Sequence, residues 1–288
     1  MSIELKNLTY TYMPGTPFEA KAVDDISLKI EDGEFLGVIG HTGSGKTTLI
    51  GLVAGLLKPT SGSVLIDDAD ISSKSYDRKA LRRSIGVVFQ YPEHQLFEET
   101  VYKDIAFGPK KTGVPEEEIE QRVRHAMELM ELDFEGVKEL SPFELSGGQK
   151  RRVAIAGVLA IRPRVLILDE PVAGLDPKGR SHLMNLITHL NGEGVTIIMI
   201  THSMDDLAEY ARRVAVLSGA RLVMDDTPQK VFLREDELKE MGLDIPYVAR
   251  IASQLRAKGF KVDDSVIRLD ELEQAAVHLI AGGKGGKG

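Results

Sequence analysis

The chain has 288 residues, of which 42% are hydrophobic and 28% are charged, and its formal net charge at pH 7 is −8. These values are typical of a globular protein with one large or two modest domains. The absence of cysteine excludes disulfides, thiolate zinc sites and cysteine nucleophiles. No apolar run reaches the roughly 18–20 residues that cross a bilayer, and Met1–Tyr10 lacks the apolar core of a signal peptide. We therefore expect the chain to stay in the cytoplasm.

The basic residues do not form a dense tract. Binding to the phosphate backbone of a nucleic acid requires a cluster of Lys and Arg. The basic runs here are short and scattered, at Arg82-Arg83, Lys150-Arg151-Arg152 and Arg212-Arg213. We expect each run to be a solvated face of a helix, and we expect no nucleic acid among the partners.

The first part of the chain has strand patterns that lead into a glycine-rich loop. Pro14, Gly15 and Pro17 separate the first two predicted strands. The third strand runs directly into the loop, and the helix after the loop is expected to end near Pro59. In chain order, the predicted elements are strands at Glu4–Tyr12, Ala22–Ile30 and Phe35–Ile39 and a helix from Lys46 to Leu57.

The middle of the chain combines short apolar strands with helical periodicity. Ile119, Val123, Met127 and Met130 recur at spacings of three and four, which predicts a helix whose methionines fill a core. The predicted elements are strands at Ile85–Phe89, Val165–Leu168 and Thr196–Ile200, helices at Glu116–Glu131 and Gln149–Ala160, and a hairpin of Val214–Leu217 with Arg221–Met224.

The composition changes after about Arg234. The last part is predicted to contain a helix at Pro246–Lys258, a strand at Val262–Ile267 and a helix at Leu269–Ile280. Gly282–Gly288 contains only Gly and Lys and is expected to be disordered. We therefore divide the chain into a main domain at 1–234, a small α/β appendage at 235–281 and a flexible tail at 282–288.

A phosphate-binding loop of the form G-x-x-x-x-G-K-[ST] is present at Gly40-His41-Thr42-Gly43-Ser44-Gly45-Lys46-Thr47. The glycines let backbone N–H groups approach the phosphates of ATP, and the following helix directs its positive end toward them. Lys46 can reach the β- and γ-phosphates, and the Thr47 hydroxyl can hold Mg²⁺. A glycine-rich turn without a ligand is the alternative.

Two carboxylates, Asp169 and Glu170, follow the predicted strand Val165–Leu168. An acid at the carboxyl end of a core strand lies in the crevice where α/β folds bind ligands. Asp169 is expected to hold Mg²⁺ directly or through water, and Glu170 is placed to polarise the attacking water. On its own the pattern is also that of a plain strand end, but it occurs downstream of a phosphate-binding loop.

Three further residues are candidates from their positions on strands. Gln90 follows a core strand, and its amide can reach Mg²⁺ or the water. His202 follows another, and its imidazole can hydrogen-bond the γ-phosphate, although a lone His is more often structural or exposed. Tyr12 is the predicted platform for adenine, because bases stack on aromatic rings. The alternatives are a Tyr12 packed on its sheet and the neighbouring Tyr10.

A second glycine-rich motif, Leu145-Ser146-Gly147-Gly148-Gln149, opens a predicted helix. Its serine and glycines offer an anion another positive helix end. Because the chain already has one phosphate-binding loop, the economical interpretation is that these donors serve the nucleotide of a partner subunit. Asp176, in Ala173-Gly174-Leu175-Asp176, is expected at that shared interface.

These motifs, in this order, resemble those of ABC-type ATPase subunits from about Ile3 to Phe232. The resemblance implies an α/β fold: a P-loop NTPase (RecA-like) core, an N-terminal antiparallel β subdomain and a helical subdomain inserted at about 91–161. It also implies that two subunits close head-to-tail around two ATP molecules and drive a membrane partner. By this resemblance, the A-loop, Q-loop, catalytic glutamate, D-loop and switch histidine are matched by Tyr12, Gln90, Glu170, Asp176 and His202.

The expected site follows from the motifs and the resemblance together. The expected catalytic residues are Glu170, His202, Gln90 and Lys46, and the expected Mg²⁺ ligands are Thr47, Gln90 and Asp169. The residues expected to contact ATP are Tyr12, Gly40, His41, Thr42, Gly43, Ser44, Gly45, Lys46, Thr47, Thr48, Gln90, Ser146, Gly147, Gly148, Gln149, Asp176 and His202.

A finer resemblance connects the chain to energy-coupling factor transporters and to their A-prime type of ATPase. It rests on Phe89–Phe97, Thr100-Val101 and Asp104–Pro109 for the transporter class, and on Leu145–Arg152, Ala154–Ala160, Asp169–Pro171 and Ala173–Pro177 for the A-prime type. Val172 stands where the common pattern has Thr. Such transporters take up vitamins or, in related systems, cobalt or nickel ions. The resemblance implies a second ATPase, a scaffold membrane protein, a separate substrate-capture membrane protein and a peripheral location on the cytoplasmic face of the cell membrane.

Two roles of surface segments are implied by the same family. Its C-terminal extension assists pairing of the two ATPases, and Pro246–Ile280 has a similar length; a packing appendage is the alternative. Tyr91–Thr100 is expected to form the groove for a coupling helix, with Leu96 and Phe97 either exposed for docking or buried in the helical subdomain.

Other classes of function fit the sequence less well. A soluble ABC protein that acts on ribosomes or DNA usually has tandem ATP domains or a long coiled-coil insertion, and the sequence contains neither. A phosphate-loop kinase or GTPase has no use for Leu145–Gln149. The ATPase of another ABC importer is the nearest alternative.

Overall fold

The computed structural model describes residues 1–283 of the chain, which form two compact units. The first unit joins Met1–Glu34 to Thr47–Ile200, and the second joins Phe35–Lys46 to the chain from Thr201 onward. Each unit is therefore assembled from two separate stretches of sequence. No helix within the described residues is long and apolar enough to cross a membrane.

An antiparallel sheet begins the first unit and confirms the predicted N-terminal β subdomain. Its strands lie in the order β2-β1-β4-β5, and Ile3 pairs with Ile30 on one side and with Ile66 on the other. Near its end β1 has register shifts, and the rings of Tyr10 and Tyr12 meet edge-on with centroids 4.8 Å apart. The strands are β1 (Ile3–Tyr12), β2 (Ala20–Ile30), β4 (Ser61–Ile66) and β5 (Ala69–Asp70).

Three parallel strands of the first unit lie in the order β8-β7-β6. They are β6 (Ile85–Val88), β7 (Val165–Asp169) and β8 (Thr196–Ile200). All residues of β7 and β8 are buried, as expected for parallel strands that are covered on both faces. Because the strands are parallel, the residues that follow them emerge at one edge.

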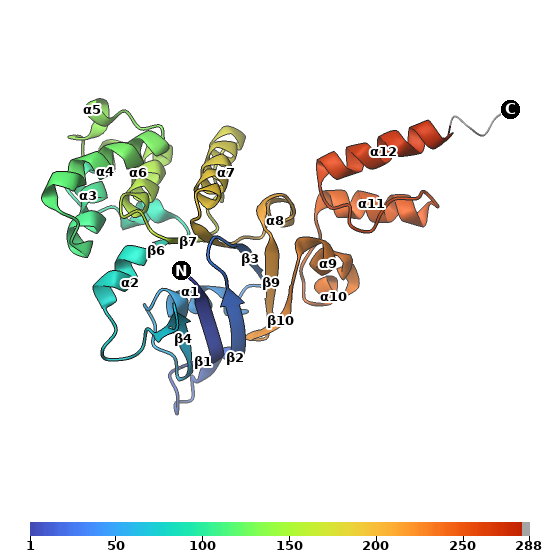
Figure 1. Cartoon of the computed structure of the whole chain (residues 1–288), viewed down its shortest axis with the longest axis horizontal. Helices are drawn as coiled ribbons and strands as arrows, with labels where there is room; N and C mark the ends of the chain where they lie inside the picture. The colour runs from blue at the N-terminus through green and yellow to red at the C-terminus, as the bar shows by residue number, and fades with distance from the viewer. Residues whose placement is uncertain (284–288) are drawn as a thin grey trace. The chain divides into compact units, whose positions relative to one another are not determined.

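The helices of the first unit include a bundle of α3, α4, α5 and α6, which lie together in Figure 1. Met127 and Met130 are buried, so the predicted core role of these methionines is confirmed. The helices are α1 (Lys46–Val53, whose first residue belongs to the second unit), α2 (Arg78–Ser84), α3 (Val101–Thr112), α4 (Glu116–Leu129), α5 (Phe134–Val137), α6 (Gly147–Leu159) and α7 (Pro177–Gly192), with 3₁₀ turns η1 (Pro92–Gln95) and η2 (Pro142–Glu144).

The second unit contains β3 beside β9 in parallel, and β9 beside β10 in the predicted hairpin. Its helices α11 and α12 lie side by side (Figure 1) and pack around Ala252, Val262 and Val266. The elements are β3 (Phe35–Ile39), β9 (Arg213–Ser218), β10 (Arg221–Asp226), α8 (Met204–Tyr210), α9 (Pro228–Leu233), α10 (Glu235–Glu240), α11 (Tyr247–Ala257) and α12 (Leu269–Gly283).

The predicted strand at Val262–Ile267 is wrong. These residues form an irregular segment with a turn at Asp264-Ser265, and Val262, Val266 and Ile267 are buried. A strand needs a neighbouring strand for its backbone hydrogen bonds, whereas this segment uses its apolar side chains to fill the space between two helices. The described part of the appendage is therefore helical rather than α/β. Residues 284–288 of the predicted disordered tail lie outside the described residues.

Gly62 offers a test of the antiparallel sheet. Its φ is +78°, and a Cβ atom there would lie 2.3 Å from the Asn7 carbonyl oxygen. Gly15 has a similar φ of +76° but open space around the Cβ position. We expect Gly62→Ala to lower the free energy of unfolding by about 3 kcal/mol or more, and Gly15→Ala by only about 1–2 kcal/mol. Chemical denaturation would measure both, and equal losses would contradict the close backbone approach at Gly62.

Candidate nucleotide-binding site

The phosphate-binding loop follows β3 in the second unit. The Ser44 N–H donates to the His41 carbonyl at 3.1 Å. The Lys46 ammonium is buried and donates to the carbonyl oxygens of Gly40 at 2.6 Å and His41 at 3.0 Å. The loop thus folds around the ammonium group of Lys46, which is the first residue of α1.

Ser44 supports an anion as the ligand of this loop. Its side chain is 1% exposed, and its hydroxyl finds no hydrogen-bond partner among the described residues. Buried polar atoms without a partner are rare in native proteins and point to a missing ligand, ion or water. The start of a helix at the same place adds unpaired backbone N–H groups and a positive dipole end. The loop therefore has the chemistry that a phosphate group requires.

Tyr12 lies beside the helix that follows the loop. Its hydroxyl is 3.2 Å from the Thr48 hydroxyl, and Thr48 is buried. The Tyr12 side chain is 42% exposed, whereas Tyr10 is less exposed and contacts the Tyr12 ring edge-on. The Tyr12 ring is therefore accessible at the surface of the β subdomain. Thr47, the expected ligand of Mg²⁺, is exposed.

Asp169 and Glu170 stand at the carboxyl end of β7, as their position in the sequence predicts. Asp169 is buried as the last residue of the strand. Glu170 has φ of +51°, a left-handed conformation that is uncommon for a residue with a side chain, and its N–H donates to the Ile200 carbonyl at 2.9 Å. Such backbone strain persists only where neighbouring groups impose it, and it concentrates at functional sites.

Gln90 and His202 also follow core strands, and both side chains are exposed. Gln90 comes just after β6 in the first unit, and the next residue, Tyr91, has φ of +55°. His202 comes just after β8 and lies in the second unit, before α8. The structure therefore gives each residue the strand-end position that the sequence predicts.

Leu145–Gln149 forms the exposed N-terminus of α6. Ser146 is the N-cap and makes a capping box with Gln149: the Gln149 N–H donates to the Ser146 hydroxyl at 3.3 Å, and the Ser146 N–H donates to Gln149 Oε1 at 3.1 Å. Leu145 is buried and anchors the segment, whereas Ser146, Gly147 and Gly148 are exposed.

The two glycines of this motif have no internal reason to be glycine. A Cβ atom at Gly147 or Gly148 would meet nothing within 4 Å, and neither residue has a positive φ. Both positions also lie in a helix, where glycine costs stability of about 1 kcal/mol relative to alanine. The helix end therefore leaves room for a group to approach its backbone closely.

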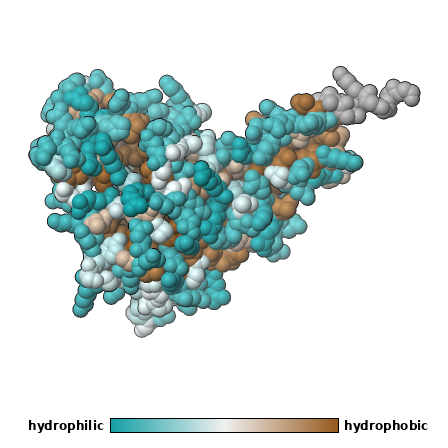
Figure 2. Space-filling view, in the orientation of Figure 1, coloured by the Kyte–Doolittle hydropathy of each residue, from teal (hydrophilic) through white to brown (hydrophobic). Residues whose placement is uncertain are grey.

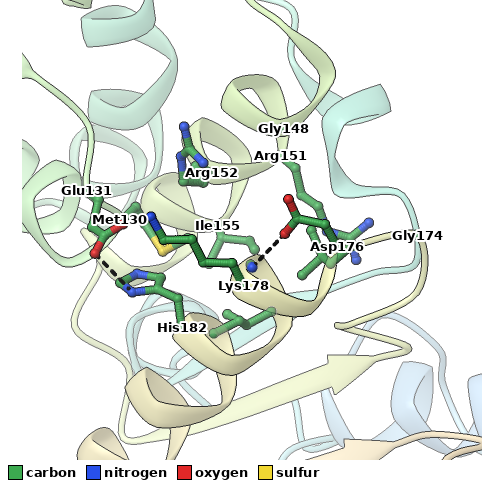
Figure 3. Close-up of a pocket in the computed structure, with 13 residues that line it drawn as sticks. Met130, Glu131, Gly148, Arg151, Arg152, Ile155, Gly174, Asp176, Lys178 and His182 are labelled. Carbon is green, nitrogen blue, oxygen red and sulfur yellow. Dashed lines mark hydrogen bonds and ion pairs between the residues drawn. The ribbon is translucent and has the colours of Figure 1, made fainter.

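The sequence interpretation misjudged Arg151. We expected Lys150-Arg151-Arg152 to be a solvated helix face, but Arg151 is 6% exposed and reaches from α6 to the loop after β7 (Figure 3). It donates to the carbonyl oxygens of Ala173 at 2.8 Å and Pro171 at 2.5 Å. Helical spacing was the available signal, because Ile155 and Leu159, four and eight residues later, are buried on the same face.

The other basic runs are also only partly as expected. Arg82 and Arg83 are exposed on α2. Arg213, by contrast, begins a strand rather than lying on a helix, and its guanidinium pairs with the Asp225 carboxylate at 2.5 Å. The hairpin between β9 and β10 brings this ion pair together.

Asp176 is exposed and caps α7, because its carboxylate accepts a hydrogen bond from the Gly179 N–H at 2.7 Å. Figure 3 shows this bond at the edge of a pocket of about 370 Å³. The pocket lies between α6, α7 and the turn after α4, where His182 contacts Glu131 at 3.3 Å. Residues of the second glycine-rich motif and of the loop before α7 therefore line one hollow.

Comparison with known proteins identifies the family. The profile of the ABC transporter family matches residues 23–173. The energy-coupling factor transporter ATP-binding protein EcfA2 of Clostridium acetobutylicum is 51% identical over 285 residues, which is 99% of this chain and 100% of the relative. The EcfA2 protein of Clostridioides difficile is 52% identical over 98% of this chain and 99% of the relative. The chain belongs to the energy-coupling factor transporter ATP-binding proteins of the ABC family.

Solved structures agree with this family. The cbiO1 protein of Clostridium perfringens, described as part of the ABC transporter complex cbiONQ, is 39% identical with a TM-score of 0.70 over 88% of this chain and 98% of that protein. A dimeric ATP-binding cassette in a post-hydrolysis state with ADP and Pi is 31% identical with a TM-score of 0.70, over 78% of this chain and 98% of that protein. The energy-coupling factor ATPase described here thus has the ABC ATPase fold that its motifs imply.

Two glycines of the phosphate-binding loop separate internal packing from ligand contact. A Cβ atom at Gly40 would lie 2.3 Å from the Leu217 carbonyl oxygen, whereas one at Gly43 would meet nothing within 4 Å. We expect Gly40→Ala to weaken ATP binding at least about tenfold and also to lower the melting temperature by several degrees. Gly43→Ala, whose φ of +82° adds only local strain, is expected to lower the melting temperature less. Thermal melts without and with ATP would check both, and an unchanged Gly40→Ala protein would contradict the close approach.

Proposed function

We propose that this protein is the ATP-binding and ATP-hydrolysing subunit that powers a membrane importer of the energy-coupling factor class. The observation that carries the proposal is the agreement with EcfA2 proteins at about half of all positions over almost the whole chain. The chain's own chemistry supports it. One polypeptide has a loop built for phosphate and a separate exposed helix end whose glycines serve no internal purpose.

The proposed ATP contacts divide by chemistry. The backbone of Gly40–Lys46 and the ammonium of Lys46 neutralise phosphate charge, with Lys46 exchanging carbonyl partners for phosphate oxygens. The ring of Tyr12 stacks on adenine, a contact worth about 1–3 kcal/mol that needs no base-specific hydrogen bond. The same ring is held by its hydroxyl contact with Thr48.

The residues proposed to hold Mg²⁺ suit that ion. Mg²⁺ prefers oxygen ligands and is usually bound by one or two carboxylates together with substrate phosphates. The Thr47 hydroxyl, the Gln90 amide oxygen and the Asp169 carboxylate are such ligands, and only Asp169 is buried. When bound, Mg²⁺ neutralises charge that develops on the transferred phosphoryl group.

Glu170 is proposed to polarise the attacking water, and His202 to hydrogen-bond the γ-phosphate. A positioned general base contributes about 10²–10⁴-fold to a rate. Glu170 has φ of +51°, so the backbone changes direction at the end of β7. This left-handed conformation sets the direction in which the Glu170 side chain leaves the backbone. Gln90, just after β6, is proposed to contact the same water or the metal through its side-chain amide.

We infer that a second ATPase subunit, identical or different, completes each site. Solved ABC cassettes with 31% identity are dimeric. Ser146, Gly147 and Gly148, which are exposed, and Gln149, which is half-buried, are proposed to bind the nucleotide of that partner, with Asp176 at the interface. The open space around both glycines is what a phosphate from outside the chain would need.

A membrane scaffold protein is proposed to dock on Tyr91–Thr100, and a substrate-capture membrane protein to act through that scaffold. Phe97 is 59% exposed and meets Phe107 edge-on at 4.9 Å, whereas Leu96 is buried. This aromatic pair is a compact apolar surface for a coupling helix. The protein would then lie peripherally on the cytoplasmic face of the cell membrane, and the cargo would be a vitamin or a transition-metal ion.

The helices α11 and α12 are proposed to assist pairing of the two ATPases. Figure 2 shows apolar surface on this C-terminal pair of helices, where Leu269 and Val277 are exposed on α12. Other apolar residues of α12, Leu272, Ala275 and Leu279, pack with α11 around one small core. The exposed Leu269 and Val277 are available for contact with a second chain.

Glu170→Gln tests the proposed base. The amide keeps the size of the side chain but cannot accept a proton, so we expect ATP binding within about twofold of wild type and a kcat at least about 100-fold lower. The variant should also accumulate as an ATP-bound dimer in size-exclusion chromatography. Glu193→Gln, at the end of α7, is the matched control and should behave as wild type. Wild-type turnover by Glu170→Gln would remove Glu170 from this role.

Mixed dimers test whether Ser146 serves the partner. Lys46→Ala disables one phosphate-binding loop, so that each mixed dimer keeps one intact loop. Placing Ser146→Arg on the Lys46→Ala subunit should weaken binding of fluorescent ATP to the intact loop at least about tenfold. Placing it on the other subunit should leave that binding unchanged, as should the exposed loop variant Ser75→Arg in either position. The reverse pattern would show that Ser146 serves its own chain.

A further inference from the structure

Arg151 connects the second glycine-rich motif to the loop that carries Glu170. It lies on α6 five residues after the N-cap Ser146, and its guanidinium group donates to three backbone carbonyls of one loop. The distances are 2.5 Å to Pro171, 2.8 Å to Ala173 and 3.4 Å to Glu170. A planar guanidinium can hold several acceptors in one fixed geometry, which a lysine ammonium cannot do.

The Arg151 guanidinium is buried, and a buried charge destabilises a protein unless hydrogen bonds or an opposite charge compensate it. Burial lowers the pKa of the Arg151 guanidinium, and the nearby Glu93 carboxylate opposes that effect by raising the pKa. Glu93 lies on η1, three residues after Gln90, and η1 packs against α6. Arg151 is therefore surrounded by three segments of the candidate site: its own helix, the turn after Gln90 and the loop after Asp169.

The loop held by Arg151 has an unusual backbone. Glu170 has φ of +51°, and Gly174 has φ of +76°. Within the loop the Ala173 N–H donates to the Glu170 carbonyl at 3.2 Å, but the carbonyls of Pro171 and Ala173 face Arg151. Loss of the guanidinium would leave these acceptors without their charged donor. The left-handed turn at Glu170 would lose its support.

We propose that Arg151 is a positioning residue that couples the two ATP sites of a dimer. The proposal rests on the proposed function, in which Ser146 contacts the partner's ATP while Glu170 acts on the chain's own ATP. Because one side chain joins the N-terminal turn of α6 to the loop that begins at Glu170, a shift of one element moves the other. Closure on the partner's nucleotide would thereby set the position of Glu170 at the chain's own nucleotide.

Arg122 provides a matched control for Arg151. It is a half-buried arginine of the helical bundle that pairs with the Glu118 carboxylate at 3.0 Å and donates to the Ile161 carbonyl just beyond α6 at 3.2 Å, and its Nε finds no hydrogen-bond partner among the described residues. Its hydrogen bonds go to Glu118 and Ile161 rather than to residues 170–173. Replacement by methionine removes an arginine charge and a carbonyl contact in both cases.

The test compares Arg151→Met, Arg151→Lys and Arg122→Met in the full-length dimer. We measure ATPase rate against ATP concentration, the affinity for fluorescent ATP and the melting temperature. For both Arg151 variants we expect kcat to fall by about tenfold or more and the Hill coefficient to fall toward 1, with ATP affinity within about threefold of wild type. Arg151→Lys keeps the positive charge and most of the volume, so it reports on the coupling even if Arg151→Met does not fold. Arg122→Met should keep the wild-type Hill coefficient and kcat.

Two outcomes would overturn the coupling role. One is a Hill coefficient and kcat in Arg151→Lys equal to those of Arg122→Met at equal melting temperature. The other is a wild-type protein that hydrolyses ATP with a Hill coefficient of 1, since there would then be nothing to couple. Failure of the proposed function is distinct from both, because the wild-type protein would not hydrolyse ATP at all.

Discussion

The triphosphate of ATP concentrates negative charge, and a protein can hold it in water only with donors that have no better partner. The first N–H groups of a helix meet this condition, because no carbonyl of the helix reaches them. The chain begins two helices in glycine-rich runs, α1 at Lys46 and α6 at Gly147. One run has a buried lysine and a buried serine hydroxyl that finds no hydrogen-bond partner in the described part of the chain, and the other run is exposed. The remaining parts of each unit fix where these two helices start.

Arg151 illustrates how polar contacts hold a loop that has little apolar content. A buried charge is costly unless hydrogen bonds and an opposite charge compensate it. Here three carbonyls and the nearby Glu93 carboxylate provide that compensation. The same hydrogen bonds hold the loop after β7 in place. Charge-assisted hydrogen bonds are short and directional, so they fix an irregular backbone better than apolar packing does. A strained residue such as Glu170 can persist at the end of β7 because several neighbouring contacts impose the same backbone conformation on it.

Sequence patterns predict the strands and the residues at their ends well, because burial and chain reversal leave local signals. Val165–Asp169 and Thr196–Ile200 are apolar runs followed by polar side chains, and both form buried strands. Helix ends are harder: α1 stops at Val53 rather than Leu57, since Gly55 takes φ of +68°. Val262–Ile267 and Arg151 were misjudged for a different reason. A segment of mixed apolar residues becomes a strand only beside another strand, and a basic residue is buried only if acceptors from elsewhere in the chain surround it, so both outcomes depend on tertiary contacts.

The glycines of the two motifs show what the structure adds to the sequence. At Gly40 a side chain would collide with the backbone of Leu217, so the fold itself demands glycine. At Gly147 and Gly148 neither the conformation nor the surroundings demand it, and helix propensity argues against it. The open space around both glycines supports the proposed approach of a phosphate from outside the chain. The capping box at Ser146 fixes the helix start beside these glycines, and this open helix end is the feature on which the proposed contact with a partner subunit's nucleotide rests.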